Sequence, residues 1–224
     1  MSLFQDNDPS KFSKLYIALK FRLHGLGYFD AMAVLELCRK IHGGFRKNGV
    51  TPSFQHQLEI AHFILTLRDV SNVEDTIIAA LCHDSMEDYP GHFLKEFRIA
   101  AEGSISERAK EVAITTSLQL DEHRYSDYNE YFSALSKNMI CSVVKGVDRI
   151  NNFQSMERGN FKTSKQQTYS DEVVTYFLPI LKEARKRFPK QMDSYYMIEY
   201  VLKSQHELIS YRLNSEVKND TIIV

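Results

Sequence analysis

Apolar residues recur at helical spacing along nearly the whole chain. Between residues 10 and 24, for example, Phe12, Leu15, Leu19 and Leu23 fall on one side of a helix, because residues three or four apart share a helix face. The same periodicity predicts helices over residues 10–24, 28–42, 55–68, 73–87, 128–136, 138–153, 168–187 and 191–213. Strand signals are weak, so the pattern predicts an all-α fold, a single-domain helical bundle with one core.

Capping and breaking residues mark the expected helix ends. Ser71 with Glu74, and Ser104 with Glu107, have the spacing of capping boxes, in which the paired side chains bond backbone N–H groups at a helix start. The second box predicts one more helix, which runs to about residue 117. Pro90 and the glycine after it are expected to stop the helix that begins near residue 73.

Less regular stretches divide the chain. The polar residues 118–127 predict a loop, and residues 214–224 predict a loose tail. We therefore expect an N-terminal helix within residues 1–27, a helical core over residues 28–187, and a C-terminal helix with its tail over residues 188–224.

Composition excludes several classes of protein. Lys and Arg number 28 against 29 Asp and Glu, a formal net charge of -1, so there is no global basic field to hold nucleic acid. No run of about 18 apolar residues predicts a membrane span, and the first residues lack the pattern of a secretory signal. Cys38, Cys82 and Cys141 are far apart and odd in number, which favours buried thiols over disulfides or a zinc cluster. We expect a cytoplasmic protein.

A dense polar group follows the most apolar helical segment. Residues 77–81 are all apolar, which is typical of a helix buried on every side. His83 with Glu87, and Asp84 with Asp88, come next at a spacing that stacks each pair one turn apart. Buried charges at this density need a metal ion or charged partners, because desolvation of an unpaired charge is costly. The alternative is a frayed helix end with solvated charges.

Two other residues can complete a metal site with His83 and Asp84. His56 begins an apolar helix after the loop of residues 43–54, and Asp148 is a carboxylate among apolar neighbours. Taken singly, His56 also fits a surface or capping histidine, and Asp148 also fits a salt bridge elsewhere. Together, two imidazoles and two carboxylates are a suitable ligand set for a divalent ion.

These residues, in this order on separate helices, resemble the HD-domain metallophosphohydrolases. Four segments narrow the resemblance to the RelA/SpoT-type alarmone hydrolases and span roughly residues 28–187. Residues 46–56 are similar to their R-K-x-G-x-P-Y-x-x-H-P segment, residues 83–88 match H-D-x-x-E-D, residues 147–152 resemble A-D-R-L-H-N, and residues 172–179 resemble E-T-x-x-x-Y-x-P, with Phe177 in place of the tyrosine.

The resemblance implies a reaction and a role for each matching residue. The reaction is manganese-dependent removal of the 3′-pyrophosphate from guanosine 3′,5′-bis(diphosphate), a small-molecule nucleotide substrate. The ligands of one divalent ion would be His56, His83, Asp84 and Asp148. The carboxylates that handle protons would be Glu87 and Asp88. The polar residues that contact the nucleotide would be Arg46, Lys47, Asn152 and Ser155.

The departures from the family pattern cluster on the nucleotide side. Gln57 replaces the proline that follows the metal-binding histidine in the family pattern, and Ser53 replaces the tyrosine of that pattern. Val50 makes the loop before His56 one residue longer than in the pattern. The downstream threonine-lysine pair appears as Thr115-Thr116. Hydrolysis is therefore a firmer expectation than the identity of the substrate.

Two other functions fit the same residues. One is an HD phosphohydrolase that acts on another nucleotide, such as a nicotinamide dinucleotide phosphate. The other is a catalytically silent alarmone-binding protein, against which the intact ligands and the intact Glu87-Asp88 pair argue. Residues 188–224 are too few for the synthetase domain of the bifunctional members, so we expect a stand-alone hydrolase.

Overall fold

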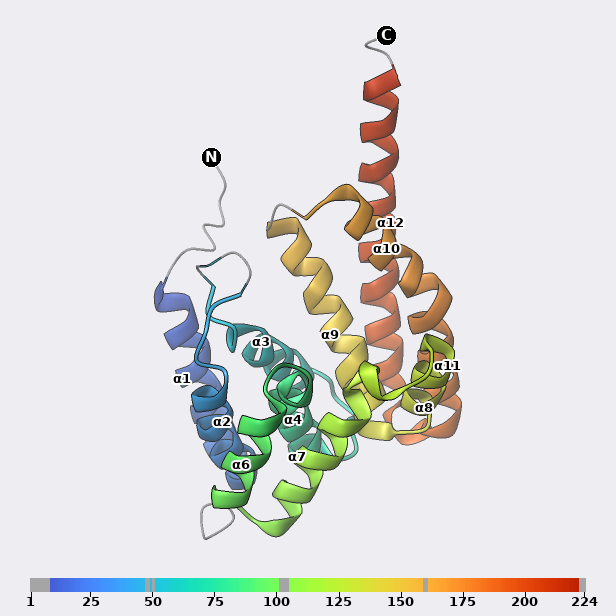
Figure 1. The fold of residues 1–224 in the computed structure, drawn as a ribbon. Helices are drawn as coiled ribbons and strands as arrows, with labels where there is room; N and C mark the ends of the chain where they lie inside the picture. Colours follow the sequence, from blue (N-terminus) through green and yellow to red (C-terminus); the bar gives the residue numbers. More distant parts are fainter. Residues whose placement is uncertain (1–8, 47–48, 50, 101–104, 159–160, 222–224) are drawn as a thin grey trace.

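The all-α prediction is confirmed. The computed structural model describes residues 9–46, 49, 51–100, 105–158 and 161–221 (Figure 1), and within these residues the backbone forms helices, turns and one isolated bridge between Phe45 and Pro52. A single cluster of buried apolar side chains runs from Tyr16 near the start to Leu213 near the end. None of the helices in these residues combines the length and the apolar character needed to cross a membrane.

The helices follow one another with short connections. Their bounds are α1 (Pro9–Leu26), α2 (Phe29–Ile41), α3 (Gln55–Ile64), α4 (Val73–Cys82), α5 (Ser85–Asp88), α6 (Pro90–Ala100), α7 (Glu107–Leu120), η1 (Glu122–Arg124), α8 (Tyr128–Ser136), α9 (Met139–Arg158), α10 (Thr163–Glu172), η2 (Val173–Phe177), α11 (Leu178–Arg187), η3 (Pro189–Gln191) and α12 (Met192–Thr221).

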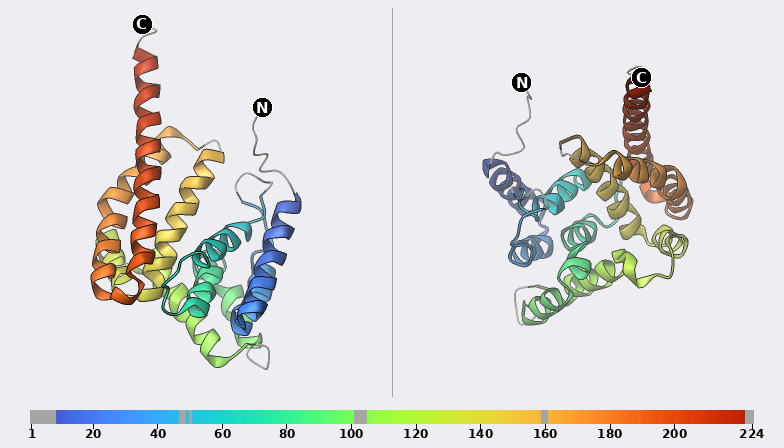
Figure 2. Two further views of the ribbon diagram at one scale, coloured as in Figure 1. Left: turned by 180° about the vertical axis from the view of Figure 1, so that it is seen from behind. Right: turned by 45° about the horizontal axis from the view of Figure 1, so that its top comes forward.

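Helix α4 lies at the centre of the N-terminal half and packs against α2, α3, α7 and α9. Every residue from Thr76 to Cys82 is buried, because a short helix surrounded by other helices has no solvent face. The long helix α9 joins this half to the C-terminal half, since it contacts α3 and α4 on one side and α8, α11 and α12 on the other (Figure 2). The ends of α3 and α4 therefore meet the middle of α9.

Gly146 lets α9 and α12 approach closely. A Cβ at this position would lie 2.8 Å from Ile198 Cγ2 on α12 and 3.3 Å from Leu181 Cδ2 on α11, so any larger residue would push the helices apart. Near one end of the same contact, the hydroxyl groups of Ser142 and Tyr195 lie 2.8 Å apart. These contacts hold α9, and with it Asp148, in a fixed position.

The helix expected over residues 168–187 contains a π-helical turn, η2, between α10 and α11. Pro179 follows this turn, and because proline has no N–H it cannot continue the regular hydrogen-bond ladder. Phe177, in the turn, lies under the Arg149 guanidinium at 4.5 Å, and Arg149 also donates to Glu172 Oε2 at 2.6 Å. Arg149 therefore connects residues 147–152 with residues 172–179, which are two of the four segments that resemble the RelA/SpoT-type hydrolases.

Several predicted helix ends were wrong. Helix α5 does end at Asp88, just before Pro90, but Pro90 also begins α6, in which proline occupies the first position, where its missing N–H has no partner to lose. The helix expected over 73–87 ends at Cys82 and resumes as the short α5. Residues 214–221, which were expected to belong to a loose tail, continue α12, and residues 222–224 lie outside the described residues.

The predicted capping boxes were also wrong. Glu74 caps a different helix, since its Oε1 accepts from the backbone N–H groups of Asp30 and Ala31 at the start of α2. Ser104 lies outside the described residues, and the hydroxyl that caps α7 belongs to Ser106, which accepts from the Ala109 N–H. The stretch expected as a polar loop over 118–127 includes the last turn of α7 and the short η1.

Candidate metal centre

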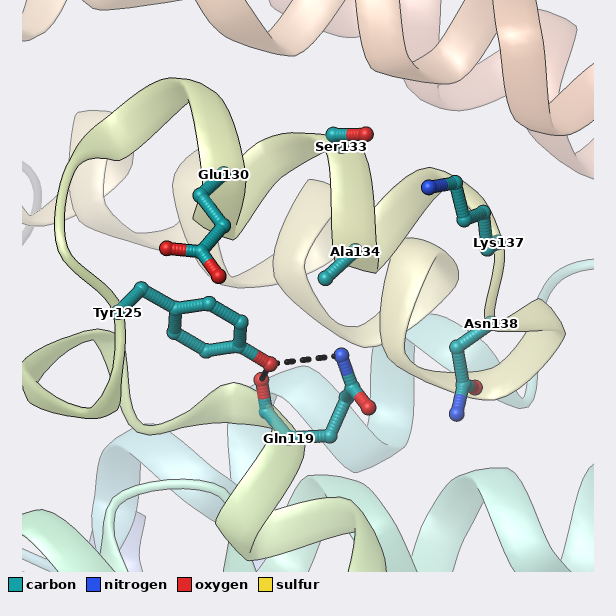
Figure 3. Close-up of a pocket in the computed structure, with 7 residues that line it drawn as sticks. All are labelled: Gln119, Tyr125, Glu130, Ser133, Ala134, Lys137 and Asn138. Carbon is teal, nitrogen blue, oxygen red and sulfur yellow. Dashed lines mark hydrogen bonds between the residues drawn. The ribbon is translucent and has the colours of Figure 1, made fainter.

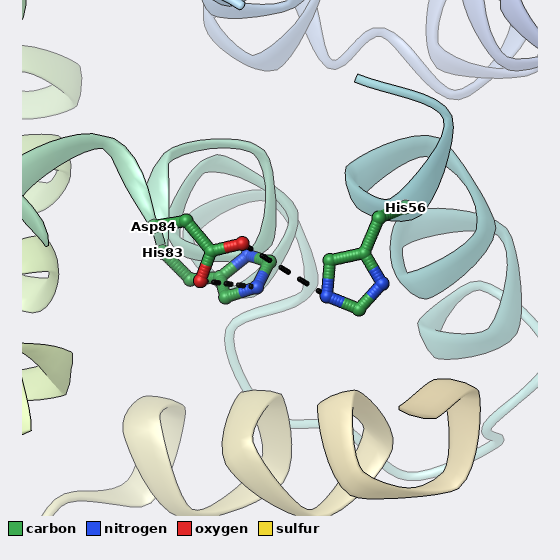
Figure 4. A group of neighbouring side chains, drawn as sticks. All are labelled: His56, His83 and Asp84. Atoms are coloured by element: carbon green, nitrogen blue, oxygen red, sulfur yellow. Dashed lines mark ion pairs between the residues drawn. The ribbon is translucent and has the colours of Figure 1, made fainter. Parts of the chain in front are cut away.

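Four side chains from three parts of the fold converge between α3, α4 and α9. His56 is the second residue of α3, His83 and Asp84 form the turn that follows α4, and Asp148 lies in the middle of α9. Figure 4 shows the rings of His56 and His83 and the carboxylate of Asp84 turned toward one another. All three predicted sequence regions are therefore brought to one place.

The ligand atoms lie within a few ångströms of each other. His56 Nε2 is 3.0 Å from Asp148 Oδ1 and 3.9 Å from Asp84 Oδ2. His83 Nε2 is 3.0 Å from Asp84 Oδ1 and 3.9 Å from Asp148 Oδ1. His56, His83 and Asp148 are buried, while the Asp84 side chain is 30% exposed. The nitrogen and oxygen atoms therefore form a group that is buried on most sides and more open to solvent on the side of Asp84.

The proton of the His56 ring is placed on Nδ1. Its Nδ1 lies 2.6 Å from Asn151 Oδ1, and the Asn151 amide nitrogen donates to Glu59 Oε2 at 2.8 Å. A carboxylate only accepts, so the Asn151 nitrogen must face Glu59 and its oxygen must face His56. His56 Nδ1–H therefore donates to Asn151, and in the neutral ring the Nε2 lone pair points at Asp148 and Asp84.

The His83 ring has the same tautomer. Its Nδ1 lies 2.7 Å from the Ala80 carbonyl oxygen, which only accepts, so Nδ1 carries the proton. His83 Nε2 is buried and makes no hydrogen bond to any residue that the structure describes. A buried nitrogen lone pair beside a carboxylate oxygen is unfavourable unless a cation or a proton lies between them.

The donor set therefore fits a divalent cation. When both rings are neutral, two imidazoles and two carboxylates present lone pairs to one another, and the ligand atoms of His56, His83 and Asp84 lie close enough together to hold a metal ion. Burial lowers the pKa of His83, but the charges of Asp84 and Asp148 outweigh burial and raise it to about 9. In the metal-free protein a proton on His83 supplies the positive charge that the carboxylates require.

Asp148 is held from two sides by its own helix. Lys145 Nζ, one turn earlier, lies 3.3 Å from Asp148 Oδ2, and the Asn152 amide donates to Oδ1 at 2.8 Å. Burial raises the pKa of the Asp148 carboxyl, but Lys145 and His56 outweigh it and hold that pKa well below its usual range. Asn152, which the resemblance predicts to contact the nucleotide, thus donates a hydrogen bond to a candidate metal ligand.

Gln57 holds the other carboxylate. Its amide nitrogen donates to Asp84 Oδ2 at 3.1 Å, so the residue that departs from the family proline contacts the candidate metal centre. Gln57 Oε1 is buried and has no hydrogen-bond partner among the described residues. On the far side of the Asp84 turn, the Ser85 hydroxyl lies 2.9 Å from His42 Nε2.

Glu87 and Asp88 lie on α5, one turn beyond the candidate ligands, and both are exposed. Glu87 Oε1 is 3.7 Å from His123 Nε2. The side chain is only partly exposed, and its partial burial, together with the negative charge of Asp84, raises the pKa of Glu87 above its ordinary value. Such a carboxyl group keeps its proton to a higher pH than an ordinary glutamate, as a proton donor requires.

The predicted nucleotide-binding residues are less well placed. Arg46 lies in the loop before α3, where its backbone N–H bonds the Thr51 carbonyl and its carbonyl accepts from Gly49. Lys47 lies outside the described residues. Ser155 is half-buried on α9, two turns beyond Asp148. No contact among the described residues joins Arg46 or Ser155 to the four candidate ligands.

Three residues around the centre were not singled out from the sequence: Asn151, Glu59 and Lys145. Asn151 and Lys145 flank Asp148 at positions +3 and -3, so helical spacing was a signal that could have identified them. Glu59 follows His56 by three residues on α3 and carried the same signal. Lys145 pairs with Asp148 on the same helix, whereas Asn151 and Glu59 meet across the contact between α9 and α3, which spacing along one helix does not reveal.

A separate pocket lies between the end of α7 and α8 (Figure 3). Its volume is about 420 Å³, and Gln119, Tyr125, Glu130 and Lys137 are among its lining residues. The Gln119 amide donates to the Tyr125 hydroxyl at 2.8 Å, so two of these polar groups satisfy each other. The pocket shares no residue with the His56–Asp148 group, and no predicted site residue lines it.

A family model described as an HD domain matches residues 34–183, which include all four candidate ligands as well as Glu87 and Asp88. Among curated proteins, none matches this chain.

Proposed function

We propose a specific reaction for this chain, which belongs to the HD-domain family of metal-dependent phosphohydrolases: removal of the 3′-pyrophosphate from guanosine 3′,5′-bis(diphosphate), with manganese as the ion. The observation that carries the proposal is the convergence of His56, His83, Asp84 and Asp148 with their lone pairs facing inward. The four segments that resemble the RelA/SpoT-type hydrolases support the choice of substrate.

The ligand roles follow from the geometry around each side chain. His56 and His83 would bind the ion through Nε2, because hydrogen bonds to Asn151 and Ala80 occupy Nδ1. Asp84 would bind from the more open side and Asp148 from the buried side. When bound, a divalent ion supplies Lewis acidity that polarises a phosphoryl oxygen and makes it easier for water to lose a proton.

The chain's own groups would then move the protons. Glu87 keeps its proton to a higher pH than an ordinary glutamate, for the reasons given above. In the proposed reaction, Glu87 or Asp88 takes the proton of the attacking water, and a carboxyl that retains a proton gives it to the leaving oxygen. Both residues are exposed on α5, one turn along the chain from His83 and Asp84, so a substrate bound there would be able to reach them.

Recognition of the substrate would rest on the loop before α3. The alarmone brings two diphosphates to a region that already holds carboxylates, so its charge must be offset by cations. Arg46 and Lys47 are the cations that the resemblance assigns to this task. The extra Val50 and the serine at position 53 change this loop relative to the family pattern, so the loop is where the substrate preference is decided.

A substrate panel tests the proposal. The purified chain with Mn²⁺ is incubated with guanosine 3′,5′-bis(diphosphate), with a nicotinamide dinucleotide phosphate and with GDP, and products are identified by mass spectrometry. We expect release of pyrophosphate from the alarmone and no release after chelation of the metal. Turnover of the dinucleotide alone would show that the dinucleotide, and not the alarmone, is the substrate. Tight alarmone binding without turnover would favour a catalytically silent binding protein.

Substitution of Glu87 separates chemistry from metal binding. Glu87→Gln keeps the shape of the side chain but cannot transfer a proton, so turnover should fall by about 10²–10⁴-fold while Mn²⁺ still binds. Glu111→Gln, an exposed residue on α7, is the matched control and should leave both unchanged. Loss of Mn²⁺ binding in Glu87→Gln would instead make Glu87 a metal ligand.

A further inference from the structure

Helix α12 has an apolar stripe on the side that faces away from the molecule. Tyr195, Ile198, Leu202, Ile209 and Leu213 are buried against α9, α10 and α11. On the opposite side, large apolar side chains remain exposed: Met197 by 51%, Tyr200 by 70%, Leu208 by 69% and Tyr211 by 78%. The C-terminal part of α12 projects beyond the other helices (Figures 1 and 2). A helix that is apolar on two sides ordinarily has a second partner.

The spacing of the stripe is symmetric about Ser204. Tyr200 and Leu208 are four residues before and after it, and Met197 and Tyr211 are seven before and after it. At about 100° per residue, all four point within about 40° of the direction of Ser204. Reversal of the helix end for end about Ser204 therefore places each of these apolar residues at the position of another apolar residue of the stripe.

We propose that α12 is a homodimer interface, in which two copies of this chain pair their α12 helices antiparallel about a two-fold axis at Ser204. A two-fold interface requires a surface that is complementary to itself after rotation. The stripe meets this requirement, because Tyr200 faces the partner's Leu208 and Met197 faces the partner's Tyr211. Ser204, the small residue of the stripe, lies at the axis and lets the two helices approach closely.

Charges beside the stripe agree with the antiparallel direction. Lys203 and Glu207 are both exposed and flank the same side of the stripe. In the antiparallel pair, the axial offset between Glu207 and the partner's Lys203 is only about 3 Å, at 1.5 Å rise per residue. Lys203 already bonds Glu199 at 2.7 Å on an exposed surface, and its long side chain can reach either carboxylate.

The area available predicts a modest affinity. A fully covered aromatic side chain buries about 150–250 Å², so the exposed parts of Tyr200 and Tyr211 offer roughly 300 Å² per copy. With Met197 and Leu208, the two copies together bury on the order of 1,000 Å², which is the lower end for a specific interface. We therefore expect a dimer that dissociates on dilution.

Sedimentation of the full chain over a range of concentrations tests the interface. The wild type should pass from monomer to dimer, and Leu208→Glu should raise the dissociation constant at least about tenfold with an unchanged helical spectrum. Phe21→Glu, which alters a 74% exposed residue on α1, is the matched control and should dimerise like the wild type. A wild type that stays monomeric throughout, or a dimer that survives Leu208→Glu, would overturn the proposal.

Cross-linking tests the antiparallel geometry directly. The native cysteines are all buried, so a cysteine placed on α12 reacts alone. Ser204→Cys should form a disulfide-linked dimer under mild oxidation, because residue 204 meets itself at the axis. Tyr211→Cys should not, because in this geometry the two copies of residue 211 are about 21 Å apart along the helices. The reverse pattern, or no link from residue 204, would refute the proposed pairing.

Discussion

Asn151 is the residue whose removal best tests how the imidazoles are oriented. In Asn151→Ala, His56 Nδ1–H loses its 2.6 Å acceptor and Glu59 loses one donor. The His56 ring is then free to move its proton to Nε2, where Asp148 Oδ1 at 3.0 Å can accept it. That tautomer suits the metal-free protein but cannot bind an ion through Nε2.

The expected losses of metal affinity and of stability follow from the difference between the metal-bound and the metal-free protein. Loss of a partner that orients a ligating histidine costs about 10–100-fold in metal affinity, which is about 1.4–2.8 kcal/mol of binding free energy. In the metal-free protein the proton shift recovers one hydrogen bond, so the free energy of unfolding should fall by only about 1 kcal/mol. Metal affinity should thus suffer more than stability.

Two other variants separate orientation from packing. Asn151→Asp keeps an oxygen for His56 but places a second carboxylate against Glu59, so it should retain metal affinity while losing stability. Ser142→Ala removes a buried hydrogen bond elsewhere on α9, that with Tyr195, and should lower stability without changing metal affinity. Only Asn151→Ala should therefore lose metal affinity, whereas the other two variants should lose stability alone.

The assays are calorimetric titration with Mn²⁺ and urea unfolding of the metal-free protein. The reasoning would be refuted if Asn151→Ala bound Mn²⁺ as tightly as the wild type while its free energy of unfolding fell. Asn151 would then be a packing residue, and the tautomer of His56 would not depend on it.

Three further changes test other parts of the structure. Asp148→Ala should abolish Mn²⁺ binding and turnover and lower the free energy of unfolding by about 3–5 kcal/mol, because Lys145 is left buried without its carboxylate; titration and urea unfolding measure both effects. Gln57→Leu should weaken Mn²⁺ binding about tenfold with little loss of stability, because its Oε1 has no partner in the described structure to lose; an unchanged titration would remove Gln57 from the centre. Gly146→Ala should lower the free energy of unfolding by about 1–2 kcal/mol, since the clash with α12 exceeds the gain in helix propensity; a stabilised protein in urea unfolding would show that α9 and α12 can separate.

The sequence was most informative where one short segment carries both a buried helix and its polar end. The apolar residues before His83 predicted a central helix, and α4 is that helix. The convergence of His56 and Asp148 with His83 and Asp84 was predicted from the resemblance to the HD-domain family, because each of the two residues taken singly also fitted a role outside a metal site. The all-α class was predictable because helical periodicity holds over most of the chain.

What the sequence could not supply depends on contacts between helices. Glu74 has the local spacing of a capping residue but caps α2, because the start of α2 packs beside it. Asn151 lies next to a residue that was singled out, yet its role depends on His56 and Glu59, which belong to α3. Pro90 marks both the end of α5 and the first position of α6, and the sequence pattern indicated only the end.

Lys145 has a consequence for the order in which the protein matures. In small metal-dependent domains the binding energy of the ion is the folding energy, and removal of the ion unfolds the chain. Here a cation that belongs to the chain itself lies 3.3 Å from Asp148, and the buried apolar cluster extends from Tyr16 to Leu213. We therefore expect folding and metal loading to be separate events, in which the chain folds first and a divalent ion then binds from the more open side at Asp84.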